Sequence, residues 1–226
     1  MALIQDEKKK AVAKAAIDEI KHDMVIGLGS GTTITYLLQE LAQRVKEGLS
    51  IQGIPSSKKT EKLAIKLNIP LAGFSEIKQL DIAIDGADEI DEHLHLLKGG
   101  GGSLVREKIV ASTAKKLVII ADDSKSVKQL GAFPLPIEVV PFGWEATARK
   151  LAALGAKSVL RKNNGKVFVS DNGNYILDCT FDNISQPQAL HENIKQLVGV
   201  VETGLFVGMA DKVIFAGHDG ITVHQR

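Results

Sequence analysis

The sequence predicts an α/β protein in which a doubly wound, mostly parallel sheet domain carries an inserted, small ferredoxin-like α+β domain. Three observations lead to this fold class. Helix and strand patterns alternate along residues 6–121, a βαββαβ order follows in the second half, and the pattern of a core strand returns at residues 212–217. The last of these strands resembles the core strands of the first half, so we expect the chain to return to the first domain there. The expected main domain is residues 1–131 plus 208–226, and the expected small domain is residues 132–207.

The elements of the first half follow from the spacing of apolar residues. A period near 3.6 residues predicts an amphipathic helix, and alternation or a short apolar run predicts a strand. Strands joined by helices pair in parallel, because a parallel pair needs a long crossover. We expect, in chain order, a helix at 6–20, a strand at 24–26, a helix at 32–45, a strand at 51–54, a helix at 57–67, a strand at 81–84, a helix from 104 and a buried strand at 116–121.

The second half changes character near the sequence FPLP at residues 133–136. The sequence DNGN at residues 171–174 is typical of a hairpin turn, because Asn and Gly tolerate the positive φ angles that such turns require. We expect a strand at 137–140, a helix at 145–154, a strand at 158–160, hairpin strands at 167–170 and 175–180, a helix at 188–197 and a strand at 200–207.

Composition and charge limit the function. The chain has 226 residues and a net charge of +1, so it lacks the strong positive field of proteins that bind nucleic acid or anionic membranes. No apolar run is long enough to span a membrane, and the start MALIQDEKKK lacks the apolar core of a signal peptide. The single Cys179 excludes an internal disulfide and indicates a buried structural thiol. We therefore expect a cytoplasmic protein without a membrane or nucleic-acid partner.

Residues 81–109 hold the richest set of candidate functional groups. A strand pattern is followed at once by five acids, and ligands of open α/β sheets bind at the carboxyl ends of strands. Lys98 and four glycines at 99–102 come next, and glycine lets a backbone approach a ligand closely. Glu107 falls in the opening turns of the following helix, aimed back toward the glycine loop. These groups suit proton transfer on a small polar substrate; the acids are Asp85, Asp88, Glu89, Asp91 and Glu92.

Each of these groups also has a structural explanation. Glu89, Asp91 and Glu92 could form a solvated loop, Lys98 could be a surface lysine, and Glu107 could complement the helix dipole. A calcium loop is disfavoured, because the acids do not fall at alternate positions around a central glycine. Four successive glycines favour a functional site, because they cost backbone entropy and bury no side chain.

A second glycine-rich loop, GLGSGTT at residues 27–33, joins a strand to a helix. Backbone N–H groups, the helix dipole and the hydroxyls of Ser30, Thr32 and Thr33 can meet an anion there. Because a dinucleotide fingerprint needs glycine at position 32 and no P-loop lysine follows, NAD and ATP fit poorly. A single phosphate or sugar hydroxyls fit well, and tight packing of strand and helix is the structural alternative.

His93 and His95 lie two residues apart and would share one face of an extended segment. No nearby cysteine or third histidine supports a metal site, so the pattern favours solvated or structural histidines, and no metal ion is expected.

Taken together, these residues resemble the A-type ribose-5-phosphate isomerases. Three signatures match in order: GSGTT at 29–33, DGADE at 85–89, and KGGGG at 98–102 with REK at 106–108. The sequences ADDSK at 121–125 and FPLP at 133–136 also resemble that family. The resemblance implies interconversion of D-ribose 5-phosphate and D-ribulose 5-phosphate in the pentose phosphate pathway, without a metal or cofactor, by a homodimer or a larger oligomer such as a tetramer.

The chemistry of such an isomerase gives the candidate residues their expected roles. The enzyme must open the sugar ring, move a proton between C2 and C1, and stabilise an enediolate. We expect Glu107 to transfer the proton, Asp85 to act as acid and base in ring opening, Lys98 to stabilise the enediolate oxygen, and Asp88 to orient Lys98 or the sugar hydroxyls. The expected substrate-binding residues, with the last two at the phosphate, are Ser30, Gly31, Thr32, Thr33, Asp85, Gly86, Ala87, Asp88, Lys98, Gly99, Gly100, Gly101, Lys125 and Lys9.

Two other functions remain open at this stage. A sugar-phosphate sensor domain of a transcription regulator would bind its ligand without converting it, but the segment ahead of the first strand is too short for a helix-turn-helix unit. A coenzyme A transferase would use a glutamate as its nucleophile, but such chains are usually longer and the sequence indicates no coenzyme A pocket.

Overall fold

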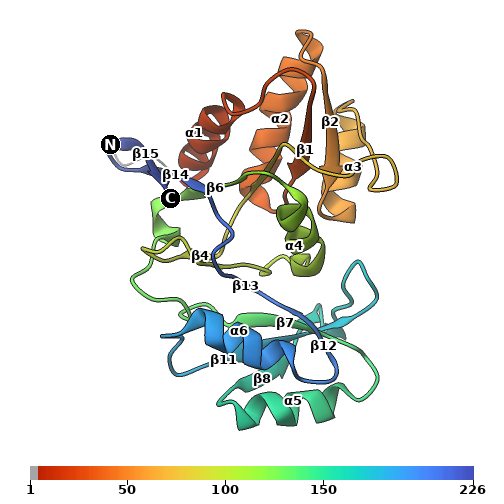
Figure 1. Ribbon diagram of the computed structural model, residues 1–226, viewed down its shortest axis with the longest axis vertical. Coiled ribbons are helices and arrows are strands. Elements are labelled where there is room, and N and C mark those ends of the chain that lie inside the picture. Colours follow the sequence, from red (N-terminus) through yellow and green to blue (C-terminus); the bar gives the residue numbers. More distant parts are fainter. Residues whose placement is uncertain (1–4) are drawn as a thin grey trace. The chain divides into compact units, whose positions relative to one another are not determined.

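The computed structural model describes residues 5–226, which divide into two compact units (Figure 1). The first unit consists of the chain up to Ala87 together with Arg106–Ser126 and Met209–Arg226. The second unit consists of Asp88–Val105 and Val127–Gly208. None of the helices in residues 5–226 combines the length and apolar character needed to cross a membrane.

The first unit alternates helices and strands, as the sequence predicts. Its elements are α1 (Gln5–Ile17), β1 (Met24–Leu28), α2 (Thr32–Lys46), β2 (Ile51–Pro55), α3 (Lys58–Lys66), β3 (Ile82–Asp85), α4 (Leu104–Thr113), β6 (Leu117–Asp122), the 3-10 helix η1 (Asp123–Lys125), β14 (Lys212–Gly217) and β15 (Gly220–Gln225). Among these elements, η1 and β15 are absent from the sequence-based expectation.

These strands form one six-stranded sheet in the order β2-β1-β3-β6-β14-β15. Every pair is parallel except β14 with β15, so the predicted mostly parallel sheet is confirmed. The chain runs outward from β1 to β2 and then returns to the other side of β1 as β3. Ligands of open α/β sheets bind at such a reversal, outside the carboxyl ends of the strands.

Helices cover both faces of this sheet. Ile26, Leu28 and Ile84 belong to a buried cluster with residues of α1 and α2, which lie side by side in Figure 1. On the opposite face, α4 packs very close to β1. A Cβ on Gly27 of β1 would lie only 2.4 Å from the Val110 side chain of α4. Alternate residues of each strand thus serve opposite layers, as the strand period of two requires.

The second unit contains short strands and two helices. Its elements are β4 (Glu89–Ile90), β5 (Leu96–Leu97), β7 (Leu135–Val139), α5 (Trp144–Ala153), β8 (Lys157–Leu160), β9 (Lys162–Asn163), β10 (Lys166–Val167), β11 (Tyr175–Thr180), α6 (Pro187–Lys195), β12 (Val200–Thr203) and β13 (Leu205–Phe206). Four strands form an antiparallel sheet in the order β12-β7-β11-β8, which is the ferredoxin-like order that the βαββαβ pattern predicts.

Two strand predictions in this unit are wrong. The segment 167–170 does not pair with β11, whose partners are β7 on one side and β8 on the other, with Cys179 opposite Ser158 of β8. The predicted strand at 200–207 is broken at Gly204 into β12, which joins the four-stranded sheet, and β13, which joins β5. Gly204 lies so close to its neighbours that a Cβ there would be 2.2 Å from the carbonyl oxygen of Lys98.

The turn at 171–174 is instead held by a buried carboxylate. Glu138 of β7 accepts hydrogen bonds from Ser170 Oγ at 2.8 Å and from Asn174 Nδ2 at 2.8 Å. Glu138 is fully buried, and both bonds go to its Oε1, where they replace those that this oxygen would make with water. The turn is also closed by the Ser170 N–H, which donates to the Asn174 carbonyl at 2.9 Å, but the strands on its two sides do not pair further.

Cys179 is buried on β11, as the sequence predicts. Burial raises the pKa of its thiol to about 12, so the reactive thiolate is scarce near neutral pH. The cysteine therefore has a structural role.

Candidate active site

The first group of predicted site residues meets at the carboxyl ends of β1 and β3. The Gly29 N–H donates to the Ile84 carbonyl at 2.9 Å, and the Ser30 N–H donates to Asp85 Oδ1 at 2.9 Å. The Gly86 N–H donates to the same carboxylate oxygen at 2.8 Å. Asp85 is 4% exposed, so two backbone donors fix its carboxylate in a place shielded from water.

Gly29 is required for this arrangement. A Cβ at this position would lie 2.2 Å from Asp85 Oδ1 and 2.6 Å from Asp85 Cα. Because the second contact is with backbone, no change of side-chain rotamer can relieve it. The first glycine of the GSGTT sequence thus allows the loop after β1 to reach the end of β3.

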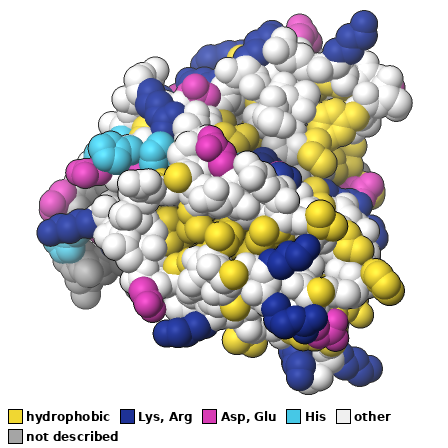
Figure 2. All heavy atoms as spheres, turned by 60° about the horizontal axis from the view of Figure 1, so that its bottom comes forward, with side chains coloured by type: hydrophobic (Ala, Val, Ile, Leu, Met, Phe, Trp, Pro, Cys, Tyr) yellow, Lys and Arg dark blue, Asp and Glu magenta, His cyan; other side chains and the backbone are white. Residues whose placement is uncertain are grey.

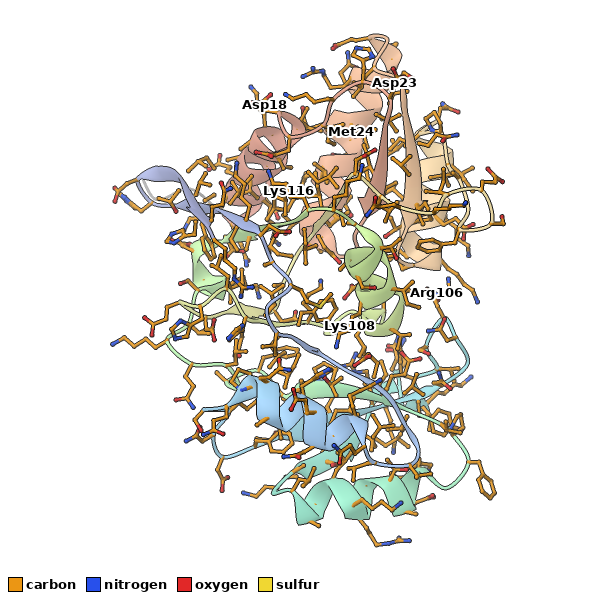
Figure 3. All side chains as sticks on the ribbon, in the orientation of Figure 1. Asp18, Asp23, Met24, Arg106, Lys108 and Lys116 are labelled. Atoms are coloured by element: carbon orange, nitrogen blue, oxygen red, sulfur yellow. The ribbon has the colours of Figure 1, made fainter. Side chains whose placement is uncertain are left out.

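Ser30 also connects this loop to Glu107. Glu107 lies in the first turn of α4 and is 4% exposed, and its Oε1 accepts a hydrogen bond from Ser30 Oγ. Figure 3 labels its neighbours Arg106 and Lys108, which leave α4 on different sides near the start of the helix. Ser30 therefore contacts both predicted acid–base groups: its backbone N–H donates to Asp85, and its hydroxyl donates to Glu107.

The start of α2 offers polar groups to an anion. Gly31 precedes the helix with φ +98°, a conformation that favours glycine, and no side chain caps the helix there. The first N–H groups of a helix lack partners within it and carry its positive dipole end. Thr32 is exposed and Thr33 half-buried, so their hydroxyls add to this site.

Sequence reasoning missed the residue that supports this loop from behind. Thr60, in the first turns of α3, donates from Oγ1 to the Gly29 carbonyl at 2.8 Å and is buried. A threonine inside a helix pattern carries no signal of such a role, because the contact joins residues 31 positions apart in the sequence.

The two predicted phosphate lysines belong to neighbouring elements of the first unit. Lys125 lies in η1, directly after β6, and is half-buried. Lys9 lies near the start of α1, where the adjacent Lys8 pairs with Asp123 of η1 at 2.6 Å. The hydrogen bond from Lys8 lowers the pKa of the Asp123 carboxyl below its usual range. This ion pair joins the start of α1 to η1.

The second group of predicted residues lies in the second unit, around the glycine loop. Lys98 follows β5, is 3% exposed, and has its Nζ 5.3 Å from the centre of the Phe206 ring, a cation–π contact. Asp88 accepts the Gly100 N–H on Oδ2 at 2.8 Å, and its own N–H donates to the Leu97 carbonyl at 2.9 Å. Asp88 therefore contacts the backbone both just before Lys98, at Leu97, and just after it, at Gly100.

The remaining acids of the cluster have structural roles or face solvent. Glu89 is buried and accepts the N–H groups of Gly131 at 2.6 Å and Phe133 at 2.5 Å, so the solvated-loop interpretation is wrong for it. Asp91 accepts the N–H groups of His93 and His95 and closes a turn. Glu92 is exposed.

The two histidines do not lie on one extended strand. Leu94 between them has φ +58°, which turns the chain, and β5 begins only at Leu96. His95 Nδ1 accepts the Gly208 N–H at 3.2 Å. This bond gives His95 a structural role, one of the two that the sequence favours.

The fold and these groups define an acid–base enzyme of the α/β class for a small polar substrate. Buried, hydrogen-bonded carboxylates stand at the reversal point of the sheet, and a loop with an uncapped helix start adjoins them.

Comparison with known proteins places the chain among such enzymes. Residues 52–220 match the family model described as ribose 5-phosphate isomerase A (phosphoriboisomerase A). The chain is 50% identical over 219 residues to ribose-5-phosphate isomerase A 2 of Oceanobacillus iheyensis, covering 96% of this chain and 98% of the relative.

Solved structures agree with this comparison. A D-ribose-5-phosphate isomerase in complex with phospho-erythronic acid is similar with a TM-score of 0.96 and 38% identity, covering 99% of this chain and 100% of that one. Ribose 5-phosphate isomerase A of Methanocaldococcus jannaschii is similar with a TM-score of 0.94 and 39% identity, over 99% of this chain and 100% of that one.

The chain belongs to the ribose 5-phosphate isomerase A family. It is accordingly an aldose–ketose isomerase that interconverts ribose 5-phosphate and ribulose 5-phosphate, and the predicted function is confirmed.

We expect Gly29→Ala to abolish most isomerase activity, because the added Cβ forces the loop after β1 away from Asp85 and displaces Ser30. Gly73→Ala is the matched control, since a Cβ there meets only Ser75 Oγ, at an ordinary 3.6 Å. Circular dichroism and steady-state rates of both variants provide the measurement. A Gly29→Ala protein as active as the Gly73→Ala protein would contradict the close-approach argument.

Proposed function

We propose that the isomerisation runs through an enediolate, with Glu107 moving the proton between C1 and C2 of the open-chain sugar. The observation that carries this proposal is the buried Glu107 carboxylate, held by Ser30 next to the fixed carboxylate of Asp85. A carboxylate can act first as general base and then as general acid, which a proton shuttle between neighbouring carbons requires.

Asp85 is assigned the acid–base work of ring opening. Two backbone N–H groups hold its Oδ1, which sets the direction of the carboxylate. Ring opening needs a proton removed from the anomeric hydroxyl and a proton delivered to the ring oxygen. A fixed carboxylate suits this exchange because its geometry costs no reorganisation when the substrate arrives.

Lys98 is assigned the stabilisation of the enediolate oxygen. Its Nζ lies against the Phe206 ring, and its burial strengthens the electrostatic effect of a charge at this position. Asp88 orients Lys98 or the sugar hydroxyls, because it contacts the chain on both sides of Lys98. Since the lysine supplies the positive charge, the proposed mechanism needs neither a metal ion nor a cofactor.

The remaining residues are proposed to bind the substrate. The α2 start and its hydroxyls supply donors for sugar oxygens or phosphate, and the lysines of α1 and η1 supply charge for the phosphate. The glycine-loop amides supply further donors. The proposed ligands beyond the four catalytic residues are Ser30, Gly31, Thr32, Thr33, Gly86, Ala87, Gly99, Gly100, Gly101, Lys125 and Lys9.

We also propose the wider setting of the enzyme. A single buried cysteine and a net charge near zero agree with a cytoplasmic location. The proposed catalytic domain consists of residues 1–131 and 208–226, and residues 132–207 form an inserted small domain.

A homodimer is the proposed assembly. Figure 2 shows hydrophobic side chains exposed among lysine and arginine side chains on one face, and Phe142, Val159, Val169 and Val198 are each more than half exposed. Light scattering coupled to size exclusion should give twice the chain mass of 24.3 kDa. A monomer at micromolar concentration would refute the proposal, and a tetramer would replace it.

We expect Lys98→Ala to lower kcat more than it raises KM, because the enediolate charge exists only after the proton is removed. By analogy with loss of one oxyanion donor, kcat should fall on the order of 10²-fold or more. Lys128→Ala, at an exposed position of the same unit, is the control. Normal kcat with weaker binding alone would make Lys98 a phosphate ligand instead.

We expect Glu107→Gln to keep the fold and bind ribose 5-phosphate, but to lose turnover by at least ~10²-fold, because an amide cannot accept the proton. Rates of ribulose 5-phosphate formation and of exchange of the C2 proton with deuterated solvent provide the measurement.

Glu61→Gln is the matched control for Glu107→Gln. Glu61 also lies in the first turn of a helix, α3, but it is exposed, so its loss tests the helix-dipole explanation alone. If Glu107→Gln bound substrate and exchanged its proton at the wild-type rate, Asp85 would become the candidate base.

A further inference from the structure

Arg161 connects the four-glycine loop to the ferredoxin-like sheet of the second unit. It lies between β8 and β9, where its N–H donates to the Ile176 carbonyl at 2.9 Å and its carbonyl accepts the Phe168 N–H at 2.9 Å. These two bonds hold its backbone against β11 and the segment after β10. The side chain therefore starts from a fixed point of the sheet.

Asp178 of β11 holds the guanidinium in one orientation. Arg161 Nε donates to Asp178 Oδ2 at 2.9 Å, and Nη2 donates to Asp178 Oδ1. The two side chains are 13% and 26% exposed. A two-point pair of this kind fixes the plane of the guanidinium, and it leaves Nη1 free to point elsewhere.

The third nitrogen holds the glycine loop. Arg161 Nη1 donates to the Gly99 carbonyl at 2.9 Å and to the Gly100 carbonyl at 3.1 Å. On the other side, the Gly100 N–H donates to Asp88 Oδ2 at 2.8 Å. The Gly99 carbonyl and the Gly100 N–H belong to one planar trans peptide and point in opposite directions. This peptide is therefore held from both sides.

The loop depends on such outside contacts for a single conformation. Gly99 and Gly102 have φ +102° and +82°, and four glycines by themselves can adopt many other backbone conformations. Phe168 closes the far end, with its ring 5.8 Å from the Arg161 guanidinium and 2.4 Å from where a Cβ of Gly102 would lie. Arg161 and Phe168 thus cover opposite ends of the loop.

We propose that Arg161 is a positioning residue of the isomerase, which orients the Gly99–Gly100 peptide and through it the loop next to Lys98. This inference rests on the proposed function, which assigns Lys98 and the loop amides to the substrate. A partner that only neutralised Asp178 would need the two bonds to that carboxylate and no more. The two further bonds to loop carbonyls require the planar fork of an arginine, which the single ammonium of lysine cannot reproduce.

Two variants test the proposal, Arg161→Lys and the double variant Arg161→Met with Asp178→Asn. The double variant removes both members of the ion pair, so it leaves no partly buried charge unpaired and avoids the main risk of misfolding. Arg149→Lys and Arg149→Met, at an exposed position of α5, are the matched controls.

We expect both Arg161 variants to lose kcat/KM on the order of 10²-fold, mainly in kcat, because small displacements of groups that act on the transition state are costly. Amide hydrogen exchange without substrate should accelerate in peptides covering 98–102, while peptides of β7 and β11 keep their protection. The Arg149 variants should match the wild-type protein in both measurements.

Three results would overturn the proposal. They are wild-type kcat/KM in both Arg161 variants, lost activity with unchanged exchange at 98–102, and accelerated exchange spread evenly over β7 and β11, which would show a role in the fold as a whole. Because the exchange measurement needs no substrate, it tests the loop separately from the chemistry. A Lys98→Ala protein with normal kcat would refute the role proposed for Lys98 and leave the loop result standing.

Discussion

The close approach of β1 and β3 is the constraint on which the arrangement of the predicted site residues in the first unit depends. The loop after β1 passes so near the end of β3 that position 29 has no room for a side chain. That approach lets one residue, Ser30, donate its N–H to Asp85 and its hydroxyl to Glu107. Strand order makes this possible, because β1 and β3 are neighbours at the point where the sheet reverses its direction of growth.

A different solution holds the four-glycine loop of the second unit. A run of glycines allows a backbone path that other residues resist, but it supplies no side chains to keep that path. Here the contacts come from a carboxylate on one side of the peptide and a guanidinium on the other. The glycines that permit many conformations lie in the loop itself. The residues that restrain it lie elsewhere: Asp88 in the chain before the loop, and Arg161 after the edge strand β8 of the small sheet.

The wrong strand predictions all concern short segments with weak patterns. Residues 167–170 are a short run of three apolar residues and a serine, yet β7 and β8 occupy the two edges of β11 that a hairpin partner would need. The strand at 200–207 continues in sequence, but the approach of Gly204 to Lys98 divides it between two sheets. Choice of partner depends on which strands compete for one edge, and that competition involves residues far apart in the sequence.

The sequence by itself determined the fold class, the ferredoxin-like order and the set of acids, lysine and glycines at the ends of strands, because periodicity and residue chemistry are local properties. It also indicated the isomerase family, since several spaced signatures agree. Only the tertiary structure decided which acids of the cluster do structural work, as with Glu89 bound to two backbone N–H groups some forty residues away. It alone decided that Thr60 supports the first loop and Arg161 the second, because hydrogen bonds across 31 and 62 positions leave no trace in local patterns.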